Sequence, residues 1–171
     1  MVASFSQARV SLPRLISDGM VLQRDAEITL WGWAAPNEAL SICFIDSTYH
    51  TQATTQGEWQ LKLSGLKAGG PYNMQLTASN QLSVNNIMVG DVYLCSGQSN
   101  MELPLKRVSW VYPEVLARDS FPAIRQFYVP RVYEFNELHS NLKACSWNEA
   151  TRRSEERRVG KECRSRWSPY H

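Results

Sequence analysis

With 171 residues, 43% of them hydrophobic and 20% charged, the chain has the composition of a soluble globular protein with one ordinary core or two small ones. No apolar run approaches the roughly 18 residues that a membrane-spanning helix needs, which excludes a transmembrane protein. The net charge of +2 does not indicate a nucleic-acid partner, because residues 153–171 alone hold six of the basic and three of the acidic residues.

Both ends of the chain lack the apolar patterns of its middle part. Residues 1–8, MVASFSQA, predict either a disordered start or the remnant of a signal peptide, since small residues precede the first apolar pattern. The last nineteen residues, RSEERRVGKECRSRWSPYH, have no apolar periodicity and resemble a translated sequencing adapter. We expect residues 153–171 to be an artefactual, disordered tail; the alternative is a basic disordered tail that belongs to the protein.

Residues 9–88 have the alternation of short antiparallel strands with one apolar face. Turn residues separate the runs, as in a small β-sandwich. The predicted strands contain Ile28–Trp31, Leu40–Phe44, Trp59–Leu63, Tyr72–Ala78 and Leu82–Asn85. The fold class that we predict is therefore β-rich, with an N-terminal antiparallel β-sandwich over residues 9–88.

The alternation of apolar and polar residues ends at IMVGDVYLC, Ile87–Cys95, where apolar residues are nearly continuous. Such a run is typical of a strand that is buried on both faces in a parallel sheet, so we expect an α/β domain over residues 89–152. Pro113–Arg118 predicts one or two helical turns, and Ile124–Val129 predicts a strand. Because so few strands cannot cover a sheet, we expect this domain to be truncated.

The sequence CSGQSNME, Cys95–Glu102, follows the apolar run directly. A serine such as Ser99, in a turn after a strand, exposes its hydroxyl at the carboxyl end of the sheet, where α/β folds bind ligands. Gly97 lets the backbone pass closely, and the amide of the serine can face a developing oxyanion. These residues also suit an ordinary loop, so the motif alone leaves both interpretations open.

Several separated segments resemble the sialate O-acetylesterase family of the SGNH hydrolase superfamily. They are LISDGMVLQR at Leu15–Arg24, WGWA at Trp31–Ala34, GEW at Gly57–Trp59, AGGPY at Ala68–Tyr72 and VGDVYLCSGQSNME at Val89–Glu102. The resemblance implies a β-domain followed by an SGNH-type α/β hydrolase domain that removes O-acetyl groups from sialic acid or related glycans. It also implies a secreted or periplasmic protein whose partner is the acetylated carbohydrate, with no cofactor and no nucleic-acid or membrane partner.

In this family the resemblance implies that Ser99 is the nucleophile, with Gly97, Gln98 and Asn100 in the oxyanion and substrate neighbourhood. The implied base is a histidine held by an aspartate in a DxxH block that this chain lacks, so we expect the chain itself to be inactive. NELH at Asn136–His139 has an asparagine where that aspartate belongs, and neither His139 nor His50 is expected to be catalytic. An acetylxylan-type esterase and a noncatalytic carbohydrate-binding β-module are the alternatives.

Other conspicuous residues have structural explanations. Cys43, Cys95 and Cys145 lack the short spacing of metal ligands, and predict buried thiols without a disulfide framework or metal site. Trp31, Trp33 and Trp59 could form a sugar platform, but aromatic residues in strands more often fill a core or an interface. Asp18, Gly19 and Arg24 predict a turn with a paired charge, in a segment that we expect to dock the two domains.

Overall fold

The computed structural model describes residues 9–97, 110–111, 113–116, 120–130, 136 and 138–151. Within these residues the chain is built mainly from strands, which confirms the predicted β-rich class. In chain order the elements are β1 (Val21–Gln23), β2 (Ile28–Trp33), β3 (Ala39–Phe44), β4 (Ser47–Gln52), β5 (Glu58–Leu63), β6 (Gly69–Thr77), β7 (Gln81–Gly90), α1 (Pro113–Leu116), β8 (Ser120–Phe127) and β9 (Trp147–Thr151).

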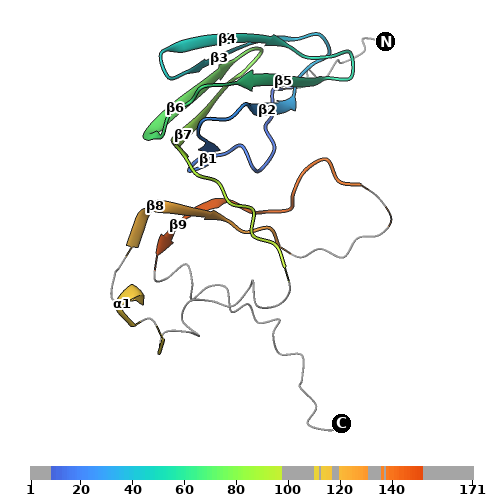
Figure 1. The fold of residues 1–171 in the computed structure, drawn as a ribbon. Coiled ribbons are helices and arrows are strands. Elements are labelled where there is room, and N and C mark those ends of the chain that lie inside the picture. Colours follow the sequence, from blue (N-terminus) through green and yellow to red (C-terminus); the bar gives the residue numbers. More distant parts are fainter. Residues whose placement is uncertain are drawn as a thin grey trace. The chain divides into compact units, whose positions relative to one another are not determined.

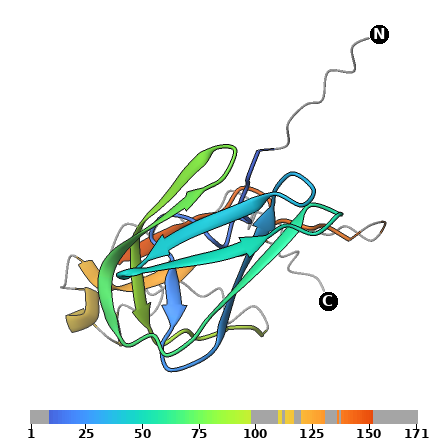
Figure 2. The same cartoon turned by 90° about the horizontal axis from the view of Figure 1, so that it is seen from above.

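Two sheets make up the N-terminal β-structure (Figure 1, Figure 2). One has five strands in the order β1-β7-β6-β3-β4, and the other pairs β2 with β5. The pairs β2–β5, β3–β4, β3–β6 and β6–β7 are antiparallel, as the sequence predicted. The pair β1–β7 is parallel, which corrects the expectation of a purely antiparallel sandwich. Parallel neighbours need a long connection, and here strands β2 to β6 supply it.

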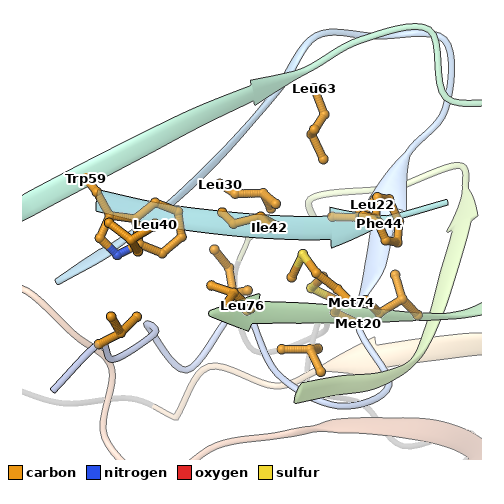
Figure 3. Close-up of a cluster of buried hydrophobic side chains, with 14 of the residues drawn as sticks. Met20, Leu22, Leu30, Leu40, Ile42, Phe44, Trp59, Leu63, Met74 and Leu76 are labelled. Carbon is orange, nitrogen blue, oxygen red and sulfur yellow. The ribbon is translucent and has the colours of Figure 1, made fainter. Parts of the chain in front are cut away.

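The hydrophobic core lies between these two sheets (Figure 3). Alternate residues of each strand point inward, because successive side chains of a strand lie on opposite faces. Core residues from the five-stranded sheet include Leu40, Ile42, Phe44, Met74, Leu76, Val84, Ile87 and Val89, and those from the β2–β5 pair include Leu30, Trp59 and Leu63. Most of the apolar residues that alternate with polar ones in the sequence therefore lie on the strand face that is buried in the core.

Strand β4 illustrates how the sheet edge is made. Its sequence, STYHTQ, is polar, and it is held by full pairing with β3 from Ala39↔Gln52 to Phe44↔Ser47. The connecting residues Ile45 and Asp46 both have positive φ, 41° and 51°, as a tight two-residue hairpin requires. An aspartate tolerates this conformation, whereas a β-branched isoleucine does so only when the surrounding strands enforce it.

Strand β7 ends at Gly90, and residues 91–97 form no strand. This corrects the expectation that Ile87–Cys95 is one strand buried on both faces. Ile87 and Val89 are buried in the sandwich core, but the side chains of Tyr93 and Leu94 are 82% and 96% exposed. The strand stops at Gly90 because no strand is left to pair with the residues beyond it. Val89 pairs with Gly69, the first residue of β6, and Gly90 pairs with Gln23, the last residue of β1.

The chain divides into two compact units. One contains residues 1–92 and 127–147, and the other contains residues 93–126 and 148–171. The second unit holds α1 and most of the β8–β9 pair. The helical turn at Pro113 and the strand near Ile124 agree with the sequence, although β8 spans Ser120–Phe127 rather than Ile124–Val129. The domain boundaries at residues 8/9, 88/89 and 152/153 stay predictions.

Residues near the end of the first unit pack against its beginning. The indole Nε1–H of Trp147 donates a hydrogen bond to the carbonyl oxygen of Leu15 at 2.8 Å. The side-chain Oδ1 of Asn141 accepts one from the Arg14 amide at 2.9 Å. The rings of Phe127 and Trp147 are in contact, with centroids 5.2 Å apart. Within the described part of the chain, no helix is long and apolar enough to cross a membrane.

Candidate active site

The approach to the predicted nucleophile begins where β7 leaves the five-stranded sheet. The Arg24 amide donates to the carbonyl oxygen of Gly90 at 2.9 Å, which continues the β1–β7 ladder by one bond. Arg24 Nε donates to Asp91 Oδ1 at 2.9 Å, and the Val92 amide donates to Gln23 Oε1 at 2.8 Å. The backbone amide of Arg24 therefore holds Gly90, and the side chains of Arg24 and Gln23 hold the next two residues, Asp91 and Val92.

The charges around Arg24 form a small network on the surface. Asp25 follows it in the chain with φ 54° and contacts both Arg24 and Lys67. A hydrogen bond from the Lys67 ammonium holds the pKa of the Asp25 carboxyl below its usual value. The side chains of this network are all substantially exposed; they are Arg24, Asp25, Lys67 and Asp91. Exposed ion pairs contribute little to stability, so the network orients the turn more than it stabilises the fold.

The segment from Asp91 to Gly97 is exposed throughout. It includes Cys95, which is exposed rather than the buried thiol that the sequence predicted, because no strand pairs with this segment in the described part of the chain. Gly97 is the last described residue of the motif Cys95–Glu102. Gln98, Ser99 and Asn100 lie outside the described residues, so their assignment as site residues stays a prediction.

The two histidines of the described part lie apart from the motif in sequence and are both exposed. His50 lies on β4, opposite Ser41 of β3. His139 precedes Asn141, whose side chain accepts a hydrogen bond from the Arg14 amide.

The described residues contain no group of three or more His, Cys, Asp or Glu side chains that could hold a metal ion. Cys43 is exposed on β3, with its sulfur 3.4 Å from the hydroxyl of Thr48. Cys145 is partly exposed. Of the three thiols predicted to be buried, two are exposed, because Cys43 lies at an exposed position of β3 and Cys95 lies in a segment that forms no strand.

Asp18 and Gly19 form a turn, and Arg24 carries a paired charge, as the sequence predicted, while the docking of the two domains by this segment stays a prediction. Asp18 Oδ1 accepts a hydrogen bond from the Asn85 amide at 2.7 Å, and the Gly19 amide donates to the Asn85 carbonyl at 2.9 Å. Gly19 has φ 79°, a conformation that favours glycine. The turn ties the entrance of β1 to the middle of β7, the strand that leads toward the motif.

Of the three tryptophans considered as a sugar platform, Trp59 is only 1% exposed and belongs to the core. Trp31 is partly buried and packs against the same core. Trp59 therefore cannot stack on a carbohydrate in this fold, and the core interpretation is confirmed for it. Trp33 is partly exposed at the end of β2, beside an isolated bridge to Ser11.

Sequence reasoning missed the role of Gln23. It lies in the segment LISDGMVLQR, but a glutamine at the end of a strand gives no signal that its side chain accepts a hydrogen bond from an amide 69 positions away. It also missed the contact of Trp147 with Leu15, 132 positions apart. Both depend on tertiary pairing that local patterns do not encode.

Comparison with known proteins gives a consistent set of relatives. No family model matches the chain. Sialate O-acetylesterase of Mus musculus is 28% identical over 149 residues, which cover 80% of this chain and 28% of that protein. Sialate O-acetylesterase of Homo sapiens is 25% identical over 149 residues, with the same coverage. The chain thus spans little more than a quarter of the length of these curated relatives.

A solved structure shows the fold directly. The carbohydrate acetylesterase from Xanthomonas citri is 35% identical in sequence and superposes with a TM-score of 0.78. The match covers 85% of this chain and 33% of that protein. The segments that resemble the family and these similarities agree: over most of its length, the chain is similar to sialate O-acetylesterases and to a carbohydrate acetylesterase.

Proposed function

We propose that the chain carries the nucleophile of a carbohydrate O-acetylesterase, which removes O-acetyl groups from sialic acid or related glycans. The observation that carries this proposal is the 35% identity, at a TM-score of 0.78, to a carbohydrate acetylesterase. The curated relatives, all sialate O-acetylesterases, support the same chemistry. Sialic acid is the sugar named for those relatives, and an acetylxylan-type substrate is the alternative within this chemistry.

The proposed mechanism is acyl transfer in two steps. The Ser99 hydroxyl oxygen attacks the carbonyl carbon of the acetyl group while a base takes its proton, and the ester C–O bond breaks as the sugar hydroxyl leaves with a proton. Water then attacks the acetyl-enzyme, which releases acetate and restores the serine. The Ser99 amide would stabilise the oxyanion, with Gly97, Gln98 and Asn100 shaping its surroundings.

We further propose that the 171-residue chain has no sustained turnover by itself. The mechanism needs a histidine base and an aspartate that orients it, and the family resemblance assigns both to a block that is not among these residues. His139 is the last residue of NELH, which has Asn136 where the aspartate belongs, and it is exposed, which suits a surface position rather than a base. Members of such a triad act as a unit, so a serine without its base loses several orders of magnitude in rate.

The test compares two proteins: the 171-residue chain, and residues 1–151 joined in frame to the coding sequence that follows Thr151 in the source DNA. Acetate release is measured with an activated acetate ester and with an O-acetylated sialoside. We expect the longer protein to turn over both substrates and Ser99→Ala to abolish turnover. Ser96→Ala is the matched control, because it removes an exposed hydroxyl three positions earlier in the same motif and should keep most activity.

Three results would contradict parts of this proposal. Undiminished turnover in Ser99→Ala would exclude Ser99 as the nucleophile. Sustained, Ser99-dependent turnover by the 171-residue chain would refute the proposed inactivity. Binding of acetylated glycan by the chain without Ser99-dependent hydrolysis in the longer protein would favour a carbohydrate-binding β-module.

A further inference from the structure

Strand β7 lies between β1 and β6, and its pairing with both strands stops near its last residue, Gly90. On one side β6 pairs with it up to Val89, and on the other β1 pairs with it up to Gly90. Beyond Gly90 the chain has no strand partner in the described residues. The first two residues past the sheet, Asp91 and Val92, would be free to change direction if nothing else held them.

Two side chains replace the missing ladder. Gln23 Oε1 accepts the hydrogen bond of the Val92 amide at 2.8 Å, as a backbone carbonyl of a longer β1 would. Arg24 Nε donates to the carboxylate of Asp91 at 2.9 Å, while the Arg24 amide binds the Gly90 carbonyl. Gln23 Nε2 in turn donates to the Arg24 carbonyl at 3.2 Å, which holds the glutamine side chain in place.

The place of these contacts gives them a consequence beyond stability. Val92 is the last residue of its stretch in the first compact unit, and Tyr93 begins the second. The segment from Tyr93 to Gly97 is exposed and leads directly to Gln98, Ser99 and Asn100. Gln23 and Arg24 therefore hold Asp91 and Val92, the two residues that directly precede this segment.

We infer that Gln23 and Arg24 are positioning residues for the esterase reaction, acting through Asp91 and Val92 on the segment that carries Ser99. This inference rests on the proposed function of Ser99. Catalytic groups must be held close to their productive geometry, and a displacement of about 1 Å can lower the rate by as much as about 100-fold. Loosening the start of the segment should therefore lower kcat while substrate binding changes little.

The first experiment measures amide hydrogen exchange in the 171-residue chain. Gln23→Met keeps the side-chain length but removes the acceptor, so exchange at Val92 should become roughly threefold to tenfold faster. Gln23→Glu keeps an acceptor oxygen and should restore slow exchange. Gln52→Met is the matched control, because Gln52 also makes an exposed side-chain to backbone hydrogen bond, at 2.9 Å to Asn37, far from the segment. Unchanged exchange at Val92 in Gln23→Met would overturn the inference.

The second experiment measures kcat and KM in the longer protein that shows Ser99-dependent turnover. Gln23→Met and Arg24→Ala should each lower kcat by about threefold to tenfold with KM within about twofold, and Gln23→Glu should recover most of kcat. Glu27→Ala is the control for the lost ion pair, since Glu27 pairs with Lys62 at 2.7 Å on the surface, in a more exposed position than Arg24 and Asp91. It should leave kcat unchanged.

The outcomes separate the two proposals. If Ser99→Ala abolishes turnover but Gln23→Met and Arg24→Ala keep full kcat, the positioning role is wrong and the proposed function stands. If no turnover depends on Ser99, the proposed function fails and the positioning role fails with it. A rise in KM alone, with kcat unchanged, would also contradict positioning of the nucleophile.

Discussion

Gly32 lies where the sandwich leaves no room for a side chain. A Cβ atom added there would lie 2.9 Å from Cζ2 and 3.0 Å from Cε2 of the Trp59 ring, and still closer to the carbonyl oxygen of Ser11. Real Cβ atoms essentially never approach this closely, so something must shift. Trp59 is 1% exposed and the Ser11 atom is backbone, so neither can move cheaply.

The cost of Gly32→Ala follows from what must move. Displacing Ser11 breaks its two hydrogen bonds with Trp33, at 2.8 and 3.0 Å, each worth about 1 kcal/mol. Overpacking against Trp59 adds roughly 1–3 kcal/mol, partly offset by the lower entropy of an unfolded alanine. We expect the free energy of unfolding to fall by about 3 kcal/mol, which lowers the urea midpoint by about 1.5 M.

Urea unfolding followed by circular dichroism measures the midpoint, and amide exchange at Ile42 assigns the loss to the sandwich. Gly90→Ala is the matched control, because a Cβ there meets only Val21 Cγ1, at 3.9 Å. It should change the free energy of unfolding by less than about 0.5 kcal/mol. Equal midpoints for the two variants would refute the close packing of β2 against Ser11 and Trp59.

Three further predictions address the core, the chain's return contact and the pH dependence. Ile42→Ala should destabilise the fold by about 2–5 kcal/mol in the same urea assay, because Ile42 is fully buried and its loss leaves a cavity; a cost below about 1 kcal/mol would contradict that burial. Trp147→Phe removes the donor to the Leu15 carbonyl but keeps a ring beside Phe127, so it should cost about 1 kcal/mol, and no cost would show that the bond does not form in solution. Hydrogen bonds from Ser79 and from the Ala35 amide lower the pKa of the Glu38 carboxyl below its unfolded value, so its stabilisation is present above pH about 4.3 and is lost as the pH falls through the lower folded-state pKa. Glu38→Gln should therefore show a smaller fall in urea midpoint between about pH 6 and pH 3 than the parent chain, and an equal fall would contradict this.

The strands were predictable where one face is buried. Leu40, Ile42 and Phe44 alternate with more exposed residues in the sequence, and the structure buries all three. Strand β4 and its turn were harder, because STYHTQ has no apolar face and Ile45 is an unusual residue at positive φ. Tertiary pairing with β3, rather than local preference, determines that hairpin.

In the run Ile87–Cys95, the apolar pattern predicted a longer strand than the structure forms. Its apolar residues suggested one buried strand, but the pattern does not reveal that β1 and β6 both end beside Gly90. The parallel β1–β7 pair was missed for a related reason, since three residues are too few to show a period. The motif itself was found from its residues and from family resemblance, and Ser99 lies outside the described residues.

The most direct test of the central claim is to trap the acetyl-enzyme in the longer protein. The protein is mixed with an activated acetate ester, quenched in acid within the first turnover and digested for peptide mass spectrometry. We predict an acetyl group on the peptide that contains Ser99, absent from Ser99→Ala and retained in Ser96→Ala. Turnover without any acetylated Ser99, or with the acetyl group on another residue, would contradict the assignment of Ser99 as the nucleophile.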